Sequence, residues 1–274
     1  MKKRVFLFLL AAAFAALACG LAVAAPKDEI VVGTASDAKS LDPQMANDTS
    51  SSCALIQMYE PLFEFSPDKK LVGYLAESWK QLDPTTWEIT LRKGVKFHNG
   101  EELKAEDVKF SLERATTEVG AHIKTYSQDL DNVEIVDDYT VILHLKKVNF
   151  PFFASLAHSW GSIVNKKEVE AQGENYGTPA GTAVGTGPFK FVSWQKSDRY
   201  TLERFDDYWG EKAKVKTLTV RAIPEPTNRT IELETGAVDI SYPISTVELS
   251  RVEGNDELTL QRMPLSSTTY MGFN

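Results

Sequence analysis

Histidine and cysteine, which commonly bind metals or act as catalytic groups, are sparse in this sequence. It contains four histidines, and no two of them have the spacing of a zinc finger or a zinc protease. They are His98, His122, His144 and His158. His144 alternates with apolar neighbours, which predicts a packed or half-exposed position in a strand. We therefore expect no metal site and no cofactor.

Nucleophile and phosphate motifs are also missing. No Gly-x-Ser-x-Gly motif presents a catalytic serine. Gly181, Gly185 and Gly187 are spaced somewhat like a phosphate-binding loop. However, no Lys-Ser/Thr follows them, and the segment leads through Pro188 into a predicted strand rather than into a helix. Carboxylates are numerous, but their spacing selects no catalytic pair, so the sequence predicts a protein that is not an enzyme.

The first residues have the composition of a secretory signal peptide. Three cations at Lys2, Lys3 and Arg4 precede an uncharged stretch that is rich in Leu, Phe and Ala. Ala22-Val23-Ala24 then supplies a small-x-small cleavage site. We expect residues 1–24 to be removed and the mature chain to be a soluble, exported protein of the periplasm.

The two cysteines bear on the route of export and on the fold. Cys19 keeps a lipoprotein anchor open as an alternative, but Ala16 stands where the lipoprotein motif usually has Leu, which favours the soluble form. After cleavage Cys53 is the remaining cysteine, so the fold cannot depend on an internal disulfide. Its place in a predicted helix start indicates a small buried apolar group rather than a nucleophile.

Charge and hydropathy exclude two classes of partner. Without residues 1–24 the chain has 250 residues, 27 cations and 38 anions, a formal charge of −11. Nucleic acids and anionic membranes attract clustered Lys and Arg, so we expect neither as a partner. No run after the leader approaches the ~20 apolar residues that a membrane span needs.

Hydrophobic periodicity predicts strands and helices in irregular alternation, which is typical of a mixed-sheet α/β fold. Asn165, three residues before Glu168, predicts a helix N-cap, and the glycine-rich segment 173–188 predicts a linker. The predicted strands are 29–35, 87–92, 133–136, 139–145, 189–194, 200–204, 217–222, 237–242, 258–262 and 268–273. The predicted helices are 51–59, 105–115, 165–173, 227–235 and 247–252.

Several motifs go beyond general physics. They are Leu41-Asp-Pro43, Tyr59-Glu-Pro-Leu62, Leu75-Ala-Glu-Ser-Trp79, Trp87 through Gly100, Ala105-Glu-Asp-Val-Lys-Phe-Ser-Leu-Glu-Arg114, Gly185-Thr-Gly-Pro-Phe189 and Arg204-Phe-Asp-Asp-Tyr-Trp209. With these motifs the sequence resembles the family 5 extracellular solute-binding proteins, which are the receptors of dipeptide, oligopeptide, glutathione and nickel ABC importers. Two residues depart from the pattern usual in that family: Lys104 stands where Thr or Ser is usual, and Asn99 stands where Asp is usual.

The resemblance implies a type II periplasmic-binding-protein-like fold. Residues 25–59 and 187–274 would form a discontinuous first lobe, and residues 60–186 would form an inserted subdomain. Family members are roughly twice as long, so the second lobe is expected to be missing from this sequence. The strand-like pattern at Thr268–Phe273 also leads us to expect that the sequence continues beyond Asn274.

The implied function is that of a receptor that binds a peptide or a glutathione-like solute. It would deliver this solute to an ABC permease in the inner membrane, and it is expected to act as a monomer. A receptor for a nickel complex stays open as an alternative, as does a truncated remnant that does not bind. A secreted hydrolase is the competing class, but no enzyme signature supports it.

The resemblance also implies where the ligand binds. Asn47, Asp48 and Thr49 correspond to a segment whose backbone pairs with peptide ligands, and short polar side chains before a helix suit that role. The alternative is that Asp48 or Thr49 merely caps the following helix. Tyr126 and Trp160 are further candidates for the binding cleft, with packing in the core as the alternative for each.

Overall fold

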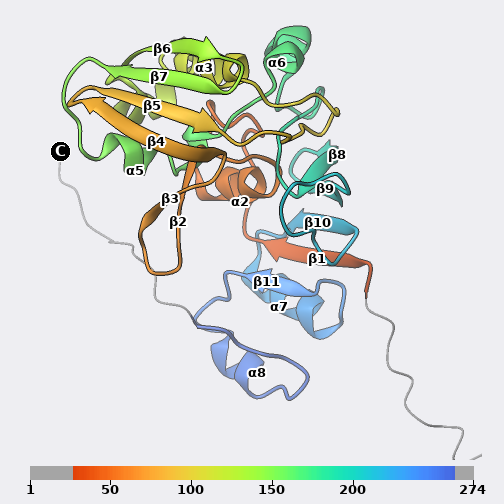
Figure 1. The fold of residues 1–274 in the computed structure, drawn as a ribbon. Helices are drawn as coiled ribbons and strands as arrows, with labels where there is room; N and C mark the ends of the chain where they lie inside the picture. The colour runs from red at the N-terminus through yellow and green to blue at the C-terminus, as the bar shows by residue number, and fades with distance from the viewer. Residues whose placement is uncertain (1–26, 263–274) are drawn as a thin grey trace, which may run out of the picture.

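The computed structural model describes residues 27–262, which form two larger sheets and a small hairpin (Figure 1). In Figure 1 the four-stranded sheet lies at the upper left, the five-stranded sheet lies at the right, and α2 (Thr49–Met58) lies between them. Among the described residues no helix is long and apolar enough to cross a membrane. The mixed α/β class predicted from the sequence is confirmed.

The five-stranded sheet combines chain segments that are distant in sequence. Its strand order is β11-β1-β10-β9-β8. β1 pairs in parallel with both β10 and β11, whereas β8, β9 and β10 pair antiparallel. The strands are β1 (Glu29–Thr34), β8 (Phe189–Gln195), β9 (Arg199–Arg204), β10 (Thr217–Ala222) and β11 (Ile240–Tyr242).

One face of this sheet packs on α2 and forms the second core. Side chains alternate along a strand, so Val32, Leu202 and Val220 lie on one face of the sheet. They share the second core with Leu55 and Met58 of α2. Full burial of each such side chain contributes about 1.5–3 kcal/mol. The second core also includes residues of the segment 164–183, among them Val164 and Tyr176.

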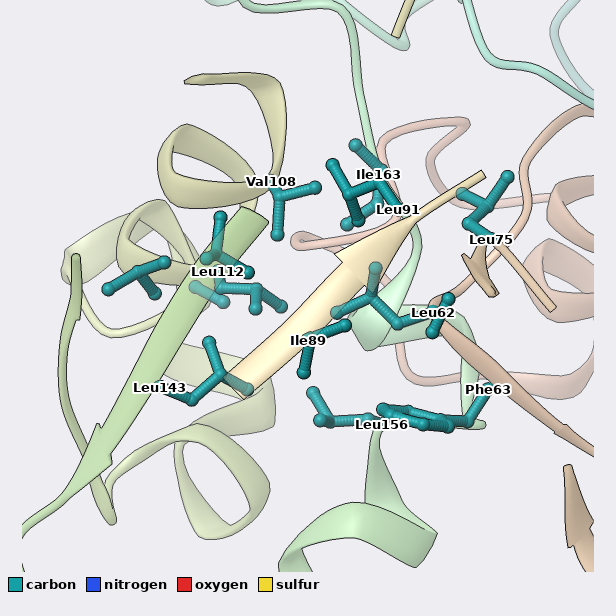
Figure 2. Packing of buried hydrophobic residues seen from close by; sticks show 14 of the residues in the cluster. Leu62, Phe63, Leu75, Ile89, Leu91, Val108, Leu112, Leu143, Leu156 and Ile163 are labelled. Carbon is teal, nitrogen blue, oxygen red and sulfur yellow. The ribbon is translucent and has the colours of Figure 1, made fainter. Parts of the chain in front are cut away.

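The four-stranded sheet is antiparallel, with the order β4-β5-β7-β6, and α3 packs against it. Ile89, Leu91 and Leu143 of the sheet meet Val108 and Leu112 of the helix (Figure 2). The buried residues of this first core all lie between Leu62 and Val184, and Trp209 packs against them from outside that range. The elements are β4 (Ala76–Asp83), β5 (Thr86–Leu91), β6 (Leu130–Asp137), β7 (Thr140–Leu145) and α3 (Ala105–Arg114).

Shorter elements connect these layers. The 3-10 turn η1 leads directly into α4, and α7 and α8 follow β10 and β11 along the chain (Figure 1). The elements are β2 (Phe63–Phe65), β3 (Leu71–Gly73), η1 (Glu118–Ile123), α4 (Lys124–Ser127), α5 (Phe152–Ser155), η2 (Ser159–Gly161), α6 (Lys166–Gln172), η3 (Gly173–Asn175), α7 (Pro226–Glu234) and α8 (Leu249–Glu253).

Local sequence signals account for several helix ends. The Asn165 side chain accepts a hydrogen bond from the Glu168 N–H at 2.9 Å, so the predicted N-cap of α6 is confirmed. Gly173 ends this helix with φ of +54°, a conformation that glycine adopts readily. At α3 the Lys104 side chain makes no cap bond, but Asp107 accepts from the Lys104 N–H at 3.1 Å.

Some predictions are wrong or fall elsewhere. Residues 258–262 alternate like a strand but form none, because within residues 27–262 no neighbouring strand supplies ladder hydrogen bonds to them. The strand predicted at 237–242 is shorter, since the N–H groups of Ala237 and Val238 bond to Glu232 at the end of α7. The leader 1–24 and the predicted strand 268–273 lie outside the described residues.

Gly185 and Gly187 bring the returning chain against the end of α2. A Cβ atom at Gly185 would lie 2.1 Å from the Met58 carbonyl oxygen, so no larger residue fits there without movement of the backbone. The N–H of Gly187 donates to that same oxygen at 2.9 Å. The glycines that resemble a phosphate loop in the sequence are therefore packing glycines.

Candidate functional site

A hollow of about 250 Å³ lies at the carboxyl ends of β1 and β11, beside the first turn of α2. Ligands of open α/β sheets commonly bind beyond the carboxyl ends of parallel strands. We therefore take this hollow as the candidate binding surface. It is lined by Thr34, Ala35, Ser36, Thr49, Ser50, Cys53, Tyr200, Val220, Tyr242 and Pro243.

The elements around the hollow are held together by short polar contacts. The hydroxyl groups of Ser36, after β1, and Ser50, in α2, lie 2.6 Å apart. The Ser51 hydroxyl accepts from the N–H of Lys39 at 2.8 Å, which ties the loop after β1 to the same turn of α2. Tyr200 and Val220 belong to the second core, so part of the lining is supported by the packed sheet.

Asp48 caps α2, and its neighbour Thr49 lines the hollow. One carboxylate oxygen of Asp48 accepts from the Ser51 N–H at 3.0 Å, and the other accepts from the Ser51 hydroxyl at 2.7 Å. The predicted capping role is therefore present in the structure. Thr49 is exposed, so its side chain is open to a ligand.

Asn47 turns away from the hollow toward the segment that carries the four-stranded sheet. Its amide group donates to the His122 carbonyl oxygen in η1 at 2.8 Å. Within residues 27–262 the N–H groups of Asn47 and Asp48 have no hydrogen-bond partner. Two adjacent backbone donors are thus free in the segment that leads directly into Thr49, which lines the hollow.

Tyr126 and Trp160 are not among the residues that line the hollow. Tyr126 is 41% exposed and stacks on His158, with ring centroids 5.8 Å apart. Trp160 has 0% exposure and packs edge-to-face against Phe152 in the first core. For Trp160 the structure favours the packing interpretation, because the ring has no exposed surface to offer a ligand.

Cys53 corrects a prediction: it is exposed rather than buried. The buried face of α2 consists of Ser51, Ala54, Leu55 and Met58, and Cys53 projects from another side of the helix. Partial desolvation, and secondly the negative charge of Asp48, raise the pKa of the Cys53 thiol. The thiol therefore lines the hollow in its neutral form.

Sequence reasoning missed the residues that reach the hollow from the strand ends, such as Thr34, Ser36 and Tyr242. A signal was available, because each lies at or just after the end of a predicted strand. Recognising it required knowing that β1 and β11 are parallel neighbours, which the sequence does not state.

The lining carries groups that can bind a solute. It presents four aliphatic hydroxyl groups, two tyrosine rings and a thiol, and no charged side chain. Among the described residues no group of three His, Cys, Asp or Glu side chains could hold a metal ion. Such a surface favours hydrogen bonding and packing against a largely neutral part of a ligand.

A second hollow, of about 540 Å³, lies on the opposite face of the five-stranded sheet. Its charged side chains already have partners: Arg221 pairs with Glu232, Arg199 pairs with Asp198, and Glu29 accepts from Thr219. Both arginines of this hollow are therefore engaged in ion pairs within the chain.

Comparison with known proteins identifies the family. The family model "Bacterial extracellular solute-binding proteins, family 5 Middle" matches residues 70–274. A curated relative, the glutathione-binding protein GsiB of Pectobacterium atrosepticum, is 34% identical over 271 residues, which covers 97% of this chain and 52% of the relative. The chain spans about half the length of the curated relatives it matches.

Solved structures show the same fold. The periplasmic binding protein DppA of Helicobacter pylori, in complex with the peptide STSA, aligns with a TM-score of 0.75 and 29% identity, over 83% of this chain and 49% of that one. MoaA of A. tumefaciens R10, in complex with mannopinic acid, aligns with a TM-score of 0.79 and 29% identity, over 84% and 48%. The type II periplasmic-binding-protein fold expected from the motifs is thus confirmed, and the chain belongs to the family 5 bacterial extracellular solute-binding proteins.

Proposed function

We propose that this protein binds peptides or glutathione-like solutes for an ABC importer, with the hollow beside α2 as part of the binding surface. The observation that carries the proposal is the pair of free backbone N–H groups at Asn47 and Asp48, directly before Thr49, which lines a neutral, hydroxyl-rich hollow. Peptide ligands are commonly bound by pairing with such extended backbone. The glutathione-binding and peptide-bound relatives point to the same class of solute.

The proposed mechanism is binding without chemistry. A solute held between two lobes adds contacts only in the closed state, so it shifts the equilibrium toward that state. The closed form is then the form that a permease in the inner membrane recognises. We propose that the protein works as an exported monomer of the periplasm, since its leader has the composition of a signal peptide.

We also propose a division of the chain into lobes. Residues 25–59 and 187–274 would belong to the first lobe, and residues 60–186 to an inserted subdomain. Two observations support this division: the buried residues of the first core all lie between Leu62 and Val184, and the five-stranded sheet uses only strands outside that range. The two units contact each other where segment 164–183 contributes to the second core, and also through hydrogen bonds such as those from Arg114 to Asp42 and from Tyr208 to Glu60.

Calorimetry of the complete gene product tests the proposed ligand class. The panel contains dipeptides, tripeptides, glutathione and a nickel–histidine complex, and we expect saturable heat from at least one peptide or glutathione. Thr49→Lys places a long cation in the hollow and should weaken that binding at least tenfold. Thr235→Lys, at an exposed site at the end of α7, is the matched control.

Two results would count against the proposal. Saturable heat from the nickel complex alone would move the protein to the nickel receptors of the same family. Equal affinity of Thr49→Lys and Thr235→Lys for the bound peptide would remove the hollow from the binding surface.

A further inference from the structure

Two of the motifs that define the resemblance meet in a buried ion pair. Arg114, the last residue of α3, donates to both carboxylate oxygens of Asp42, at 2.9 and 2.6 Å. The Asp42 side chain has 0% exposure and the Arg114 side chain 13%. The same guanidinium group donates to the Gln44 side-chain oxygen at 2.8 Å. One arginine thus holds two buried residues of the segment that leads to α2.

These contacts converge on the base of the loop that carries the free backbone donors. The N–H of Gln44 donates to Asp42 at 3.0 Å, and the N–H of Met45 donates to the Asp42 carbonyl oxygen at 3.1 Å. The Gln44 amide group donates across to the Ser162 carbonyl oxygen at 3.0 Å. Residues 42–45 are therefore clamped from the side of the four-stranded sheet.

Beyond this clamp the loop has few other attachments. Between Met45 and the first turn of α2, the Asn47 side chain makes one further contact, to His122. The next fixed point is the Asp48 cap of α2. Ala46, which is 2% exposed, also packs in the second core, so the position of residues 45–49 depends on the clamp, on this packing and on the start of the helix.

We propose that Arg114 is a positioning residue for the binding surface. It reaches from α3 to hold Asp42 and Gln44, and it thereby sets where the backbone donors of Asn47 and Asp48 stand relative to the hollow. The planar guanidinium group can bind a carboxylate with two parallel bonds and still reach a third acceptor, which an ammonium group cannot do in the same geometry. The expected loss of solute affinity rests on the proposed function, whereas the positioning of the loop by Arg114 does not.

The test compares Arg114→Lys with Arg221→Lys in the complete gene product. Both substitutions replace an arginine that bridges a helix and a neighbouring segment, but Arg221 pairs with Glu232 on the opposite sheet face. Amide hydrogen exchange is measured by mass spectrometry, and affinity is measured by calorimetry with the peptide or glutathione that the wild type binds. We expect Arg114→Lys to raise exchange selectively in residues 43–49 and to weaken binding at least tenfold. Arg221→Lys should do neither.

The readouts separate this inference from the proposed function. If the wild type binds no solute of the panel, the proposed function fails, and selective exchange in residues 43–49 still decides whether Arg114 positions the loop. Equal exchange of this loop in the two variants would overturn the inference. Should Arg114→Lys fail to fold, Gln44→Met removes one acceptor without leaving a buried charge unpaired, and the same selective exchange is expected.

Discussion

At the residue scale, Glu60 is a buried carboxylate that accepts three side-chain hydrogen bonds. It accepts from the Tyr208 hydroxyl at 2.6 Å and from the Trp209 indole and the Thr186 hydroxyl, both at 2.7 Å. Burial raises its pKa, while these hydrogen bonds act to lower it. The residue thus joins the start of segment 60–186 to the chain that returns after it.

Substitution of Glu60 should separate hydrogen bonding from charge. Glu60→Leu leaves three donors without an acceptor, and we expect it to lower the free energy of unfolding by about 2–4 kcal/mol in urea denaturation. Glu60→Gln keeps one oxygen for Trp209 and Thr186, while its amide can donate to Tyr208, so we expect a loss below about 1.5 kcal/mol. Equal losses in both variants would contradict the role of Glu60 as a hydrogen-bond hub.

His98 predicts a dependence of stability on pH. Its ring lies between the N–H of Gly185 at 3.2 Å and the carbonyl oxygen of Gly187 at 3.0 Å. Desolvation lowers its pKa to about 4. In the unfolded chain the ring becomes protonated near pH 6.5, whereas in the folded protein it stays neutral down to about pH 4. The contribution of His98 to the free energy of unfolding is therefore fully present above about pH 6.5. It is lost between about pH 6.5 and about pH 4, by up to about 1.4 kcal/mol per pH unit.

His98→Gln isolates this contribution. We expect the variant to be less stable than the wild type at pH 7.5 and the gap to narrow steadily between about pH 6.5 and about pH 4. Urea denaturation of both proteins across that range is the measurement. A gap that stays constant over the whole range would show that His98 does not titrate with the lowered pKa.

At the element scale, the start of α2 serves both folding and the candidate site. Asp48→Ala removes the acceptor of the Ser51 N–H, and we expect it to lower the free energy of unfolding by about 1 kcal/mol. Asp48→Asn retains a capping oxygen, so it should cost less. Calorimetry with the same two variants tests whether Asp48 also contacts the ligand. If Asp48 serves only as a helix cap, Asp48→Asn should bind the solute with unchanged affinity. Weaker binding by this variant would place the Asp48 carboxylate against the ligand.

At the scale of the whole molecule, closure around a solute should cover the exposed thiol of the hollow. Cys53 lines the hollow, and its raised pKa predicts slow alkylation at neutral pH that accelerates as the pH rises. We expect a bound solute to slow this alkylation further in the complete, leader-free protein, followed by mass spectrometry of the modified thiol. Unchanged alkylation at saturating solute would mean that the solute binds elsewhere or that closure leaves the hollow open.

Much of the local structure was predictable because it depends on neighbouring residues. The N-cap at Asn165 and the helices at 105–115 and 165–173 were predicted correctly from short windows, and the capping alternative for Asp48 is present in the structure. The hairpin β2–β3 and the edge strand β4 were not predicted as strands, since their alternation is weak and seven of the eight residues of β4 are exposed. The strand predicted at 258–262 failed for the converse reason, because alternation alone does not supply a pairing partner.

The sequence by itself determined the fold class, the family and the absence of known catalytic motifs, because these depend on residue types at fixed spacings along the chain. Only the tertiary structure showed that Cys53 faces outward, that Trp160 is enclosed, and that Thr34 and Tyr242 meet beside α2. It also joined Arg114 to Asp42 and Glu60 to Tyr208. The physical reason is that such contacts link residues tens to hundreds of positions apart, and their meeting depends on strand order and helix packing rather than on any local pattern.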